Sequence, residues 1–338
     1  MDRSSLGLFA ASIALWSSSV EAAPCTGPCR LLKSLPRCEV PVASAFDRNT
    51  IFPPGGDSDR YAAPTDDQLD AFERSLRAAV AGDRDAWGRA FEAGYLLCAR
   101  PNEDTLLWRP AIAGSGWAIV ALRVDNARPL IFEVPHPIYD SGTLRQGRYA
   151  YGSLKARALV ASGTHRCANA GFTLCEGFTR VCSERLERYR ESDVAHSERA
   201  MFHAAHRVLS DAFRDAAIIS LHGMGDDGIS LSDGTTIATS STSRVARLLF
   251  ALEDAFELDL VTACNEAPGA AVSAHLCGTT NIQGRYTNGL SESCVGTATA
   301  SSDRFFHVEQ SKAVRRKYRR VVRAIGKALA ADAVSRPP

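Results

Sequence analysis

The sequence predicts an α/β fold in which buried strands form a sheet between layers of helices. Beyond about Trp108, short and almost uniformly apolar runs alternate with longer stretches of helical periodicity. Uniform apolar runs are typical of strands buried on both faces, and such sheets are covered by helices. The eight histidines are placed unevenly, because none precedes His136 and none follows His307. Ligands bind at the carboxyl ends of strands in open α/β sheets, so we expect the histidine-bearing part to carry the chemistry.

Length and charge exclude several other classes of protein. The chain has 338 residues, of which 45% are hydrophobic and 23% charged, which suits one large globular domain or two ordinary ones. A disordered, collagen-like or coiled-coil chain has a different composition. The formal net charge of +1 argues against a nucleic-acid-binding protein.

The first 22 residues have the features of a secretory signal peptide. An apolar stretch runs from Leu6 to Trp16, and Val20 and Ala22 are small residues at the −3 and −1 positions of a cleavage site. We therefore expect cleavage after Ala22 and a secreted or periplasmic protein. No later run reaches about 18 uninterrupted apolar residues, so stable membrane insertion is not expected.

The ten cysteines are expected to form up to five disulfides, because an exported protein folds in an oxidising compartment. A zinc–thiolate site is the alternative, but the sequence contains no CxxC pair. The connectivity stays open. Cys25 with Cys29 and Cys175 with Cys182 are near neighbours that would close local loops.

The chain is expected to divide into the signal peptide (1–22), a cysteine-containing lead-in and helical region (23–105) and an α/β domain (106–338). Residues 23–64, the lead-in, are rich in Pro, Gly and Ser and are expected to be irregular. Thr65 has the position of an N-cap, with Gln68 completing a capping box. A second helix is expected over 83–99.

In the α/β domain, the alternation of patterns predicts the following strands: 117–123, 129–134, 156–161, 216–221, 258–263 and 305–308. Helices are expected over 197–215, 243–256 and 311–331. The last helix is basic, and we expect its apolar stripe to pack on the sheet. A phosphate-binding or membrane-binding face on that helix is the alternative. Residues 226–234 lack the spacing of an EF-hand and are expected to form a polar loop.

Four of the expected strand ends carry a histidine: His136, His165, His222 and His307. Two of these also carry an acid, Asp140 after His136 and Glu309 after His307. A catalytic zinc takes about three His or carboxylate ligands, and a further carboxylate moves the proton of the attacking water. The sequence has no GxSxG, HExxH or P-loop motif, so zinc hydrolysis is the chemistry that these residues favour.

An ordered set of short motifs over about residues 115–320 resembles the N-formylglutamate amidohydrolase family, within the zinc carboxypeptidase and aspartoacylase-like group. The motifs are Pro135-His136, Thr164-His165-Arg166, Phe202-His203-Ala-Ala-His206, Leu221-His222-Gly223-Met224, Asn265-Glu-Ala-Pro-Gly269 and His307-Val-Glu309-Gln310. The resemblance implies a three-layer α/β/α sandwich with a mixed central sheet and one zinc ion. It makes residues 106–338 a zinc hydrolase-like domain.

The resemblance also implies roles for particular residues. His136 and His222 are the expected zinc ligands, Glu309 the general base, and Arg166 the residue that holds a substrate carboxylate. Asp140 follows His136 on the same turn and is the expected third ligand, with His165 as the alternative.

Three further residues are expected near the substrate. His203 and His206 share one helix face, where they would bind substrate, orient ligands or pack the helix. Arg285 is the candidate for a second contact with an anionic group.

We therefore expect a secreted zinc-dependent amidohydrolase or carboxypeptidase-like enzyme. Its substrate would be small or peptidic and would carry a carboxylate, as an N-acyl amino acid, a peptide or a cell-wall fragment does. The alternative is a non-catalytic secreted binding protein on the same scaffold. A third option is a protein that binds nucleic acid or a membrane surface through the basic C-terminal helix.

Overall fold

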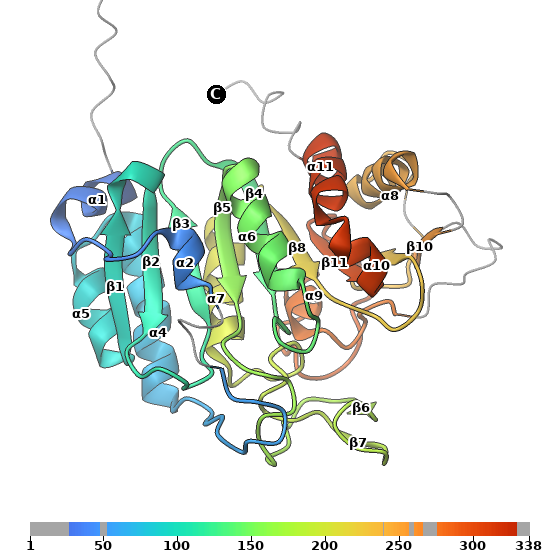
Figure 1. The fold of residues 1–338 in the computed structure, drawn as a ribbon, viewed down its shortest axis with the longest axis horizontal. Coiled ribbons are helices and arrows are strands. Elements are labelled where there is room, and N and C mark those ends of the chain that lie inside the picture. Colours follow the sequence, from blue (N-terminus) through green and yellow to red (C-terminus); the bar gives the residue numbers. More distant parts are fainter. Residues whose placement is uncertain (1–26, 48–52, 239, 257–259, 266–275, 330–338) are drawn as a thin grey trace, which may run out of the picture.

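The structure, a computed structural model, describes residues 27–47, 53–238, 240–256, 260–265 and 276–329. The expected signal peptide lies outside the described residues. Nine strands form one sheet in the order β1-β2-β3-β5-β4-β8-β11-β9-β10 (Figure 1). The strands are β1 (Tyr95–Arg100), β2 (Thr105–Pro110), β3 (Ile119–Arg123), β4 (Arg128–Val134), β5 (Ala156–Ala161), β8 (Ala217–Leu221), β9 (Ile229–Ser232), β10 (Val261–Ala263) and β11 (Phe305–Gln310).

The sheet is mixed, as the family resemblance implies. Strands β5, β4, β8 and β11 run parallel in its centre. The β1, β2 and β3 strands pair antiparallel on one side, and β9 pairs antiparallel with β11 on the other. The parallel strands therefore present their carboxyl ends at one edge, toward which the short hairpin of β6 (Phe178–Thr179) and β7 (Glu187–Arg188) projects (Figure 1).

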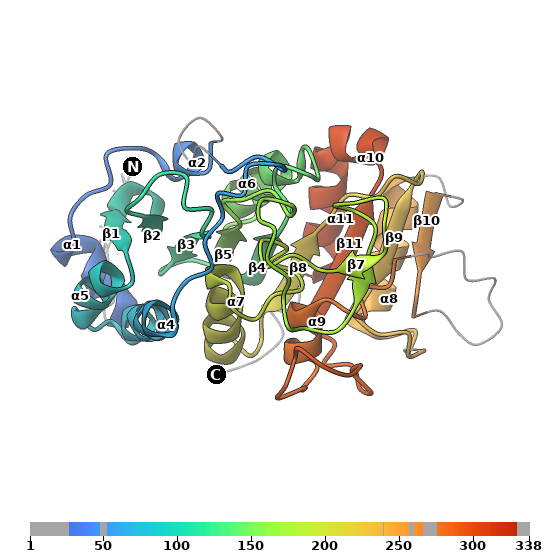
Figure 2. The same cartoon turned by 90° about the horizontal axis from the view of Figure 1, so that it is seen from below.

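Helices cover both faces of the sheet, which gives the three layers of an α/β/α sandwich. On one face lie α1 (Leu31–Ser34), α4 (Asp66–Ala81), α5 (Asp85–Glu92), α7 (Met201–Ala212) and α9 (Ile282–Thr287). On the other lie α2 (Val42–Ala45), α6 (Thr143–Ser153), α8 (Arg244–Ala255), α10 (Lys312–Arg316) and α11 (Tyr318–Leu329). Figure 2 shows α4, α5 and α7 on one side of the sheet and α2, α6 and α10 on the other.

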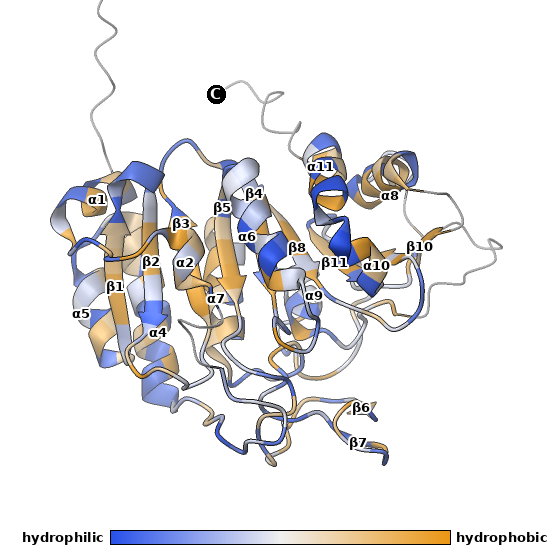
Figure 3. Ribbon diagram, viewed as in Figure 1, coloured by the Kyte–Doolittle hydropathy of each residue, from blue (hydrophilic) through white to orange (hydrophobic). Residues whose placement is uncertain are grey.

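Each face of the sheet has its own apolar core, because side chains alternate along a strand. In β4, Leu130 and Phe132 belong to one core, whereas Ile131 between them belongs to the other. Figure 3 shows the apolar colouring of the strands between helices that are polar on their outer sides. This double burial explains the uniformly apolar runs of the sequence.

The predicted capping box is confirmed at the start of α4. The Thr65 side chain accepts from the Gln68 N–H, and the Gln68 side chain accepts from the Thr65 N–H. The helix predicted over 83–99 is wrong in its second half. The observed helix in this range, α5, ends at Glu92, and strand β1 begins at Tyr95. Gly94 has φ +78°, a conformation that glycine adopts without a steric cost and that turns the chain into the strand.

Strands β1 and β2 pair with each other and belong to the same sheet as the rest of the strands. The expected boundary at residue 105 therefore falls within a hairpin of this sheet. The lead-in also contacts the outer strand: the Ala99 N–H donates to Pro36 O, and the Cys38 N–H donates to Ala99 O. A disulfide from Cys38 to Cys98 fastens the same segment.

Two other expectations concern the second half of the chain. Residues 226–234 are not entirely a polar loop, because Ile229–Ser232 is the buried strand β9 between β11 and β10. The C-terminal helix packs as expected, with Val322, Ile325 and Leu329 buried in the core beneath it. It is divided at Lys317 into α10 and α11.

Four disulfides join cysteines within the described residues: Cys38–Cys98, Cys167–Cys182, Cys175–Cys294 and Cys264–Cys277. The local pairing of Cys175 with Cys182 is wrong, because each of them bonds to a different partner. The expected pairing of Cys25 with Cys29 involves a residue outside the described part. Among the described helices, none has both the length and the apolar character that crossing a membrane requires.

Candidate metal centre

The candidate site is assembled by three neighbouring strands. β4, β8 and β11 are adjacent in the sheet and parallel, so their carboxyl ends lie side by side. His136 follows the end of β4 after a single proline, His222 directly follows β8, and Glu309 is the penultimate residue of β11. Asp140 lies in the turn between His136 and α6, where its N–H donates to the His136 carbonyl.

The structure brings His136, Asp140 and His222 together into a buried group whose potential ligand atoms all lie within 4.8 Å of one another. The Asp140 Oδ2 is 3.3 Å from His136 Nδ1 and 3.9 Å from His222 Nδ1. Two ligand atoms bound to a tetrahedral zinc are separated by about 3.4 Å, given bonds of about 2.1 Å. The three atoms are therefore spaced as the ligands of one small cation would be.

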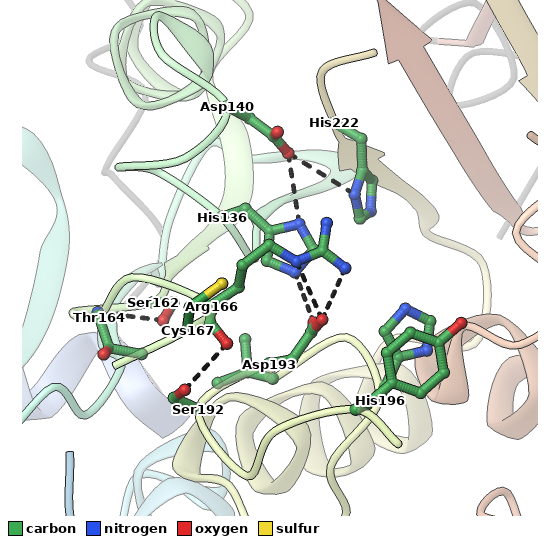
Figure 4. Close-up of polar contacts among 12 residues, drawn as sticks. His136, Asp140, Ser162, Thr164, Arg166, Cys167, Ser192, Asp193, His196 and His222 are labelled. Carbon is green, nitrogen blue, oxygen red and sulfur yellow. Dashed lines mark hydrogen bonds and ion pairs between the residues drawn. The ribbon is translucent and has the colours of Figure 1, made fainter. Parts of the chain in front are cut away.

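Hydrogen bonds at the far side of each ring orient the two imidazoles, and Figure 4 shows the one between His136 and Asp193. His136 Nε2 lies 2.8 Å from Asp193 Oδ1, and His222 Nε2 lies 2.9 Å from Ser220 Oγ. With Nε2 donating to these oxygens, both Nδ1 lone pairs face the Asp140 carboxylate. Metal-binding histidines are held in this way by a partner on the second nitrogen.

An observation within the site supports a cation between these atoms. Among the described residues, the buried His136 Nδ1 finds no hydrogen-bond partner, although Asp140 Oδ2 lies 3.3 Å away. When the lone pair of a histidine nitrogen faces a carboxylate in a buried site, the repulsion between them destabilises the fold unless a positive charge lies between them. Burial, followed by the neighbouring His307 and His136, lowers the pKa of His222 well below its usual value, which keeps this ring neutral and able to bind a metal.

His136 has the opposite electrostatic environment. Burial and the Arg166 charge lower its pKa, but the Asp193 charge and the close contacts with the Asp140 and Asp193 carboxylates outweigh them, so that the pKa is raised overall. The two carboxylates attract a positive charge to this ring, as a proton on Nδ1 or as a cation in the same place. Zn²⁺ fits the donor set of two imidazoles and one carboxylate.

Glu309 lies beside this group, with Oε1 3.9 Å from His222 Nδ1 and 3.7 Å from His307 Nε2. Burial and the nearby Asp140 charge raise its pKa to about 8. Within the described part of the chain, the buried Oε2 has no hydrogen-bond partner. The carboxyl group therefore has unused hydrogen-bonding capacity beside the adjoining space.

That space is a cavity of about 410 Å³ that reaches His136, His222 and Glu309. The β6–β7 segment contributes Thr179 and Val181 to its wall. On the other side lie the residues that follow Leu276, a segment that the Cys264–Cys277 disulfide ties to the end of β10. The site is therefore open to a ligand at the edge of the sheet.

A stacked ring pair closes part of this cavity. The rings of Tyr189 and His196 are parallel, with centroids 3.6 Å apart. His196 Nδ1 also lies 2.9 Å from the Thr280 carbonyl oxygen. Burial lowers the pKa of His196 to about 4, so this ring is neutral at pH 7.

Arg166 lines the cavity, but two of its three guanidinium nitrogens bind the Asp193 carboxylate. Its Nε and Nη2 both donate to Asp193 Oδ2, at 2.9 and 2.6 Å. Nη1 makes no hydrogen bond to any described residue. Tyr139 covers the guanidinium, whose carbon lies 5.4 Å from the centre of the ring.

His165, the alternative ligand, is near the site but outside the groups that could hold a metal among the described residues. Its Nδ1 accepts from the Cys167 N–H, and its ring faces Tyr139 and Gly56. This ring is therefore engaged with the loop that follows β5.

The structure does not bring His203, His206 or Arg285 to the cavity. His206 lies between Glu133 and Thr287, and His203 lies near Gln283 and Ser293. These contacts are those of helix-packing residues. The Arg285 guanidinium donates to backbone carbonyls, namely those of Thr279, Ser293 and Cys294.

Two residues that contact the candidate ligands were missed by sequence reasoning, Asp193 and Ser220. Asp193 lies in an irregular segment without periodicity, and its contacts with His136 and Arg166 span 57 and 27 positions in the chain. Ser220 is a polar residue in an apolar strand, two positions before His222. That placement, on the same side of the strand, was a signal that the sequence contained.

No family model matches the chain, and no curated protein matches it either. Among solved structures, the zinc-free form of a protein called YNDL is 16% identical with a TM-score of 0.35, over 63% of this chain and 89% of that one. A provisionally assigned metallopeptidase from Shewanella amazonensis is 13% identical with a TM-score of 0.33, over 63% of this chain and 82% of that one. Another from Shewanella denitrificans is 13% identical with a TM-score of 0.30, over 74% of this chain and 90% of that one. Such similarities assign no residue roles, and the site is described by its own geometry.

Proposed function

We propose that this protein is a secreted zinc-dependent amidohydrolase, similar in its chemistry to N-formylglutamate amidohydrolases. The observation that carries the proposal is the convergence of His136 Nδ1, His222 Nδ1 and Asp140 Oδ2 in a buried group beside a cavity. These three residues would hold the ion. When bound there, zinc supplies Lewis acidity, which polarises a carbonyl and lowers the pKa of water.

Glu309 is the proposed general base. It lies at the cavity beside the metal group, and its Oε2 has no partner among the described residues. Its carboxylate takes a proton from the attacking water and returns it to the leaving nitrogen of the amide.

Arg166 is the proposed anchor for a carboxylate on the substrate. Its two contacts with Asp193 leave Nη1 for a hydrogen bond with a ligand in the cavity. An N-acyl amino acid, a peptide or a cell-wall fragment would present such a carboxylate. His203, His206 and Arg285 are left out of this proposal, because their polar atoms bind other parts of the protein.

A secreted or periplasmic location agrees with the four disulfides among the described residues. Disulfides form and persist in oxidising compartments. The expected signal peptide with cleavage after Ala22 would deliver the chain there. Processing at that position is tested by the mass of the N-terminus of the exported protein.

The test of this function combines activity with metal content. Glu309→Gln should keep zinc and fold while kcat falls by about 100-fold or more, since loss of a general base costs about 10²–10⁴ in rate. The substrates are N-acyl amino acids, and the matched control is Glu39→Gln, which changes an exposed glutamate. Near-normal turnover in Glu309→Gln would overturn the assignment of the base. Wild-type protein purified without chelator and holding less than about half an equivalent of zinc would overturn the metal site.

A further inference from the structure

His222 belongs to a second group of potential ligands, with His307 and Glu309, whose ligand atoms also lie within 4.8 Å of one another. We propose that His307 and Glu309 form a second, weaker cation site beside the first, and that a cation bound there inhibits the enzyme. The ligand class is a small divalent ion, with Zn²⁺ as the best fit to an imidazole and a carboxylate. The inhibition rests on the function proposed above, whereas the binding site does not.

The strand geometry brings these two side chains together. His307 and Glu309 are two positions apart in β11, and residues at that spacing lie on the same face of a strand. The His307 Nε2 is 3.7 Å from Glu309 Oε1. This separation is close to the value of about 3.4 Å for two ligands of one tetrahedral zinc. Neither atom needs to move far to bind one ion.

The His307 ring is held in this position by the segment opposite it. Gly278 has φ +64°, and a Cβ at that position would lie 2.7 Å from atoms of the ring. Only a residue without a side chain lets the backbone approach so closely. The ring is thus packed against the backbone on one side and presents Nε2 to Glu309 on the other.

Glu309 has unused binding capacity. Its side chain is buried, and Oε2 has no hydrogen-bond partner among the described residues. Glu309 lines the cavity, and buried polar atoms are paired in most proteins, so this unpaired oxygen leaves the carboxylate with capacity to bind a ligand. The carboxylate can supply one oxygen or both to a cation next to His307.

The second site is the weaker one, because the two groups share His222. The His222 Nδ1 binds one ion at a time, and the first group adds both His136 and Asp140 to it. With the first ion in place, the second would have only two protein ligands, His307 and Glu309. Fewer protein ligands give lower affinity, so the second site fills only when free zinc is in excess.

Occupation of the second site has a direct chemical consequence. Glu309 is the proposed general base, and a carboxylate that donates its lone pairs to a cation no longer accepts a proton from water. The bound ion also takes space in the cavity next to both groups. Excess zinc should therefore stop turnover without removing the first ion.

The experiment is a zinc titration of metal-free protein by equilibrium dialysis, with calorimetry to separate the binding phases. Wild-type protein should bind one ion tightly and a second one more weakly. His307→Gln should keep the tight phase and weaken the second by at least about tenfold. Asp140→Asn should weaken the tight phase instead. Glu39→Gln, which changes an exposed glutamate outside both groups, is the matched control, and it should keep both phases.

A persisting tight phase in His307→Gln shows that the variant is folded. Glu309→Gln is a second variant, with the same expected loss of the weak phase. Saturation of the wild type at one ion up to millimolar zinc would overturn the second site, as would an unchanged weak phase in His307→Gln and Glu309→Gln.

The inhibition is measured on the same proteins. Activity of the wild type should fall as the weak phase fills, and His307→Gln should need at least about tenfold more zinc for the same fractional loss. Half-maximal inhibition at the same zinc concentration in both proteins would overturn the link to His307. Two binding phases in a protein without any amidase activity would support the second site and contradict the proposed function.

Discussion

The Asp193 carboxylate links Arg166 to His136. Its Oδ1 lies 2.8 Å from His136 Nε2, and its Oδ2 accepts two hydrogen bonds from Arg166. The charges of Arg166 and His136 outweigh burial and hold the pKa of Asp193 far below its usual value, so the group stays ionised. One buried carboxylate therefore orients a candidate metal ligand and a candidate substrate anchor together.

Asp193→Asn should lower the affinity for zinc by about 10- to 100-fold, the usual effect of losing the partner of a metal-binding histidine. It should also destabilise the protein, because Arg166 would keep a buried charge without its counter-charge. The measurements are zinc competition against a chromogenic chelator and urea unfolding of the metal-free form. Asp70→Asn, in an exposed helix position, is the control. Unchanged zinc affinity in Asp193→Asn would contradict the role of the Asp193 charge in supporting His136 as a ligand.

Asp140→Asn should remove most of the bound zinc, because an amide is a weak ligand compared with a carboxylate. His165→Gln should retain it, since its Nδ1 accepts from the Cys167 N–H and the ring lies outside the buried group. Metal analysis of both purified variants decides between the two candidate third ligands. The reverse pattern, with zinc lost only in His165→Gln, would assign the third position to His165.

Arg166 should make the enzyme selective for substrates that carry a carboxylate. An N-acyl amino acid and its carboxamide analogue differ only in that group, and a hydrogen bond between charged groups contributes about 1.5–3 kcal/mol. The ratio of the two kcat/KM values should be about tenfold or more, and Arg166→Lys should reduce it. The ratio is the informative quantity, because the variant also disturbs Asp193 and lowers both rates. Equal kcat/KM for the two substrates would contradict the anchor.

The buried His203 should make the fold sensitive to mild acid. Burial, followed by the charges of His206 and Arg207, lowers its pKa well below 6.5. Below pH 6.5 the unfolded chain takes up a proton that the folded chain refuses, so the free energy of unfolding falls as pH falls. One such group contributes a slope of up to about 1.4 kcal/mol per pH unit. His203→Gln should therefore lose less stability than the wild type between pH 7 and 5 in urea unfolding, and parallel pH profiles would refute the assignment.

Local patterns predicted the elements that depend on local interactions. The capping box at Thr65 and Gln68 is one, and strand β5 over Ala156–Ala161 is another, with the same limits in sequence and structure. Strand β1 was missed because helical periodicity was extended past Gly94, the residue that turns the chain, and because Tyr95–Arg100 is held by pairing with β2. Tertiary contacts of this kind override local propensity.

The site was predictable where it follows strand ends and hidden where it depends on long-range contacts. His136, His222 and Glu309 could be found because each stands at the carboxyl end of an apolar run. The placement of His206 against Glu133 could not be, because the two residues are 73 positions apart. Disulfide pairing has the same limit, since Cys175 and Cys294 are separated by 119 positions.

The contacts between the lead-in and β1 bear on how an edge of the sheet is protected. β1 is the outermost strand on its side of the sheet, and a bare outer strand exposes backbone groups on which other chains can assemble into aggregates. The segment around Pro36 and Cys38 hydrogen-bonds to Ala99 and is fastened there by a covalent cross-link. The part of the chain without evident chemistry therefore acts as a cover for the strand edge. Until this cross-link forms, the edge is open to self-association.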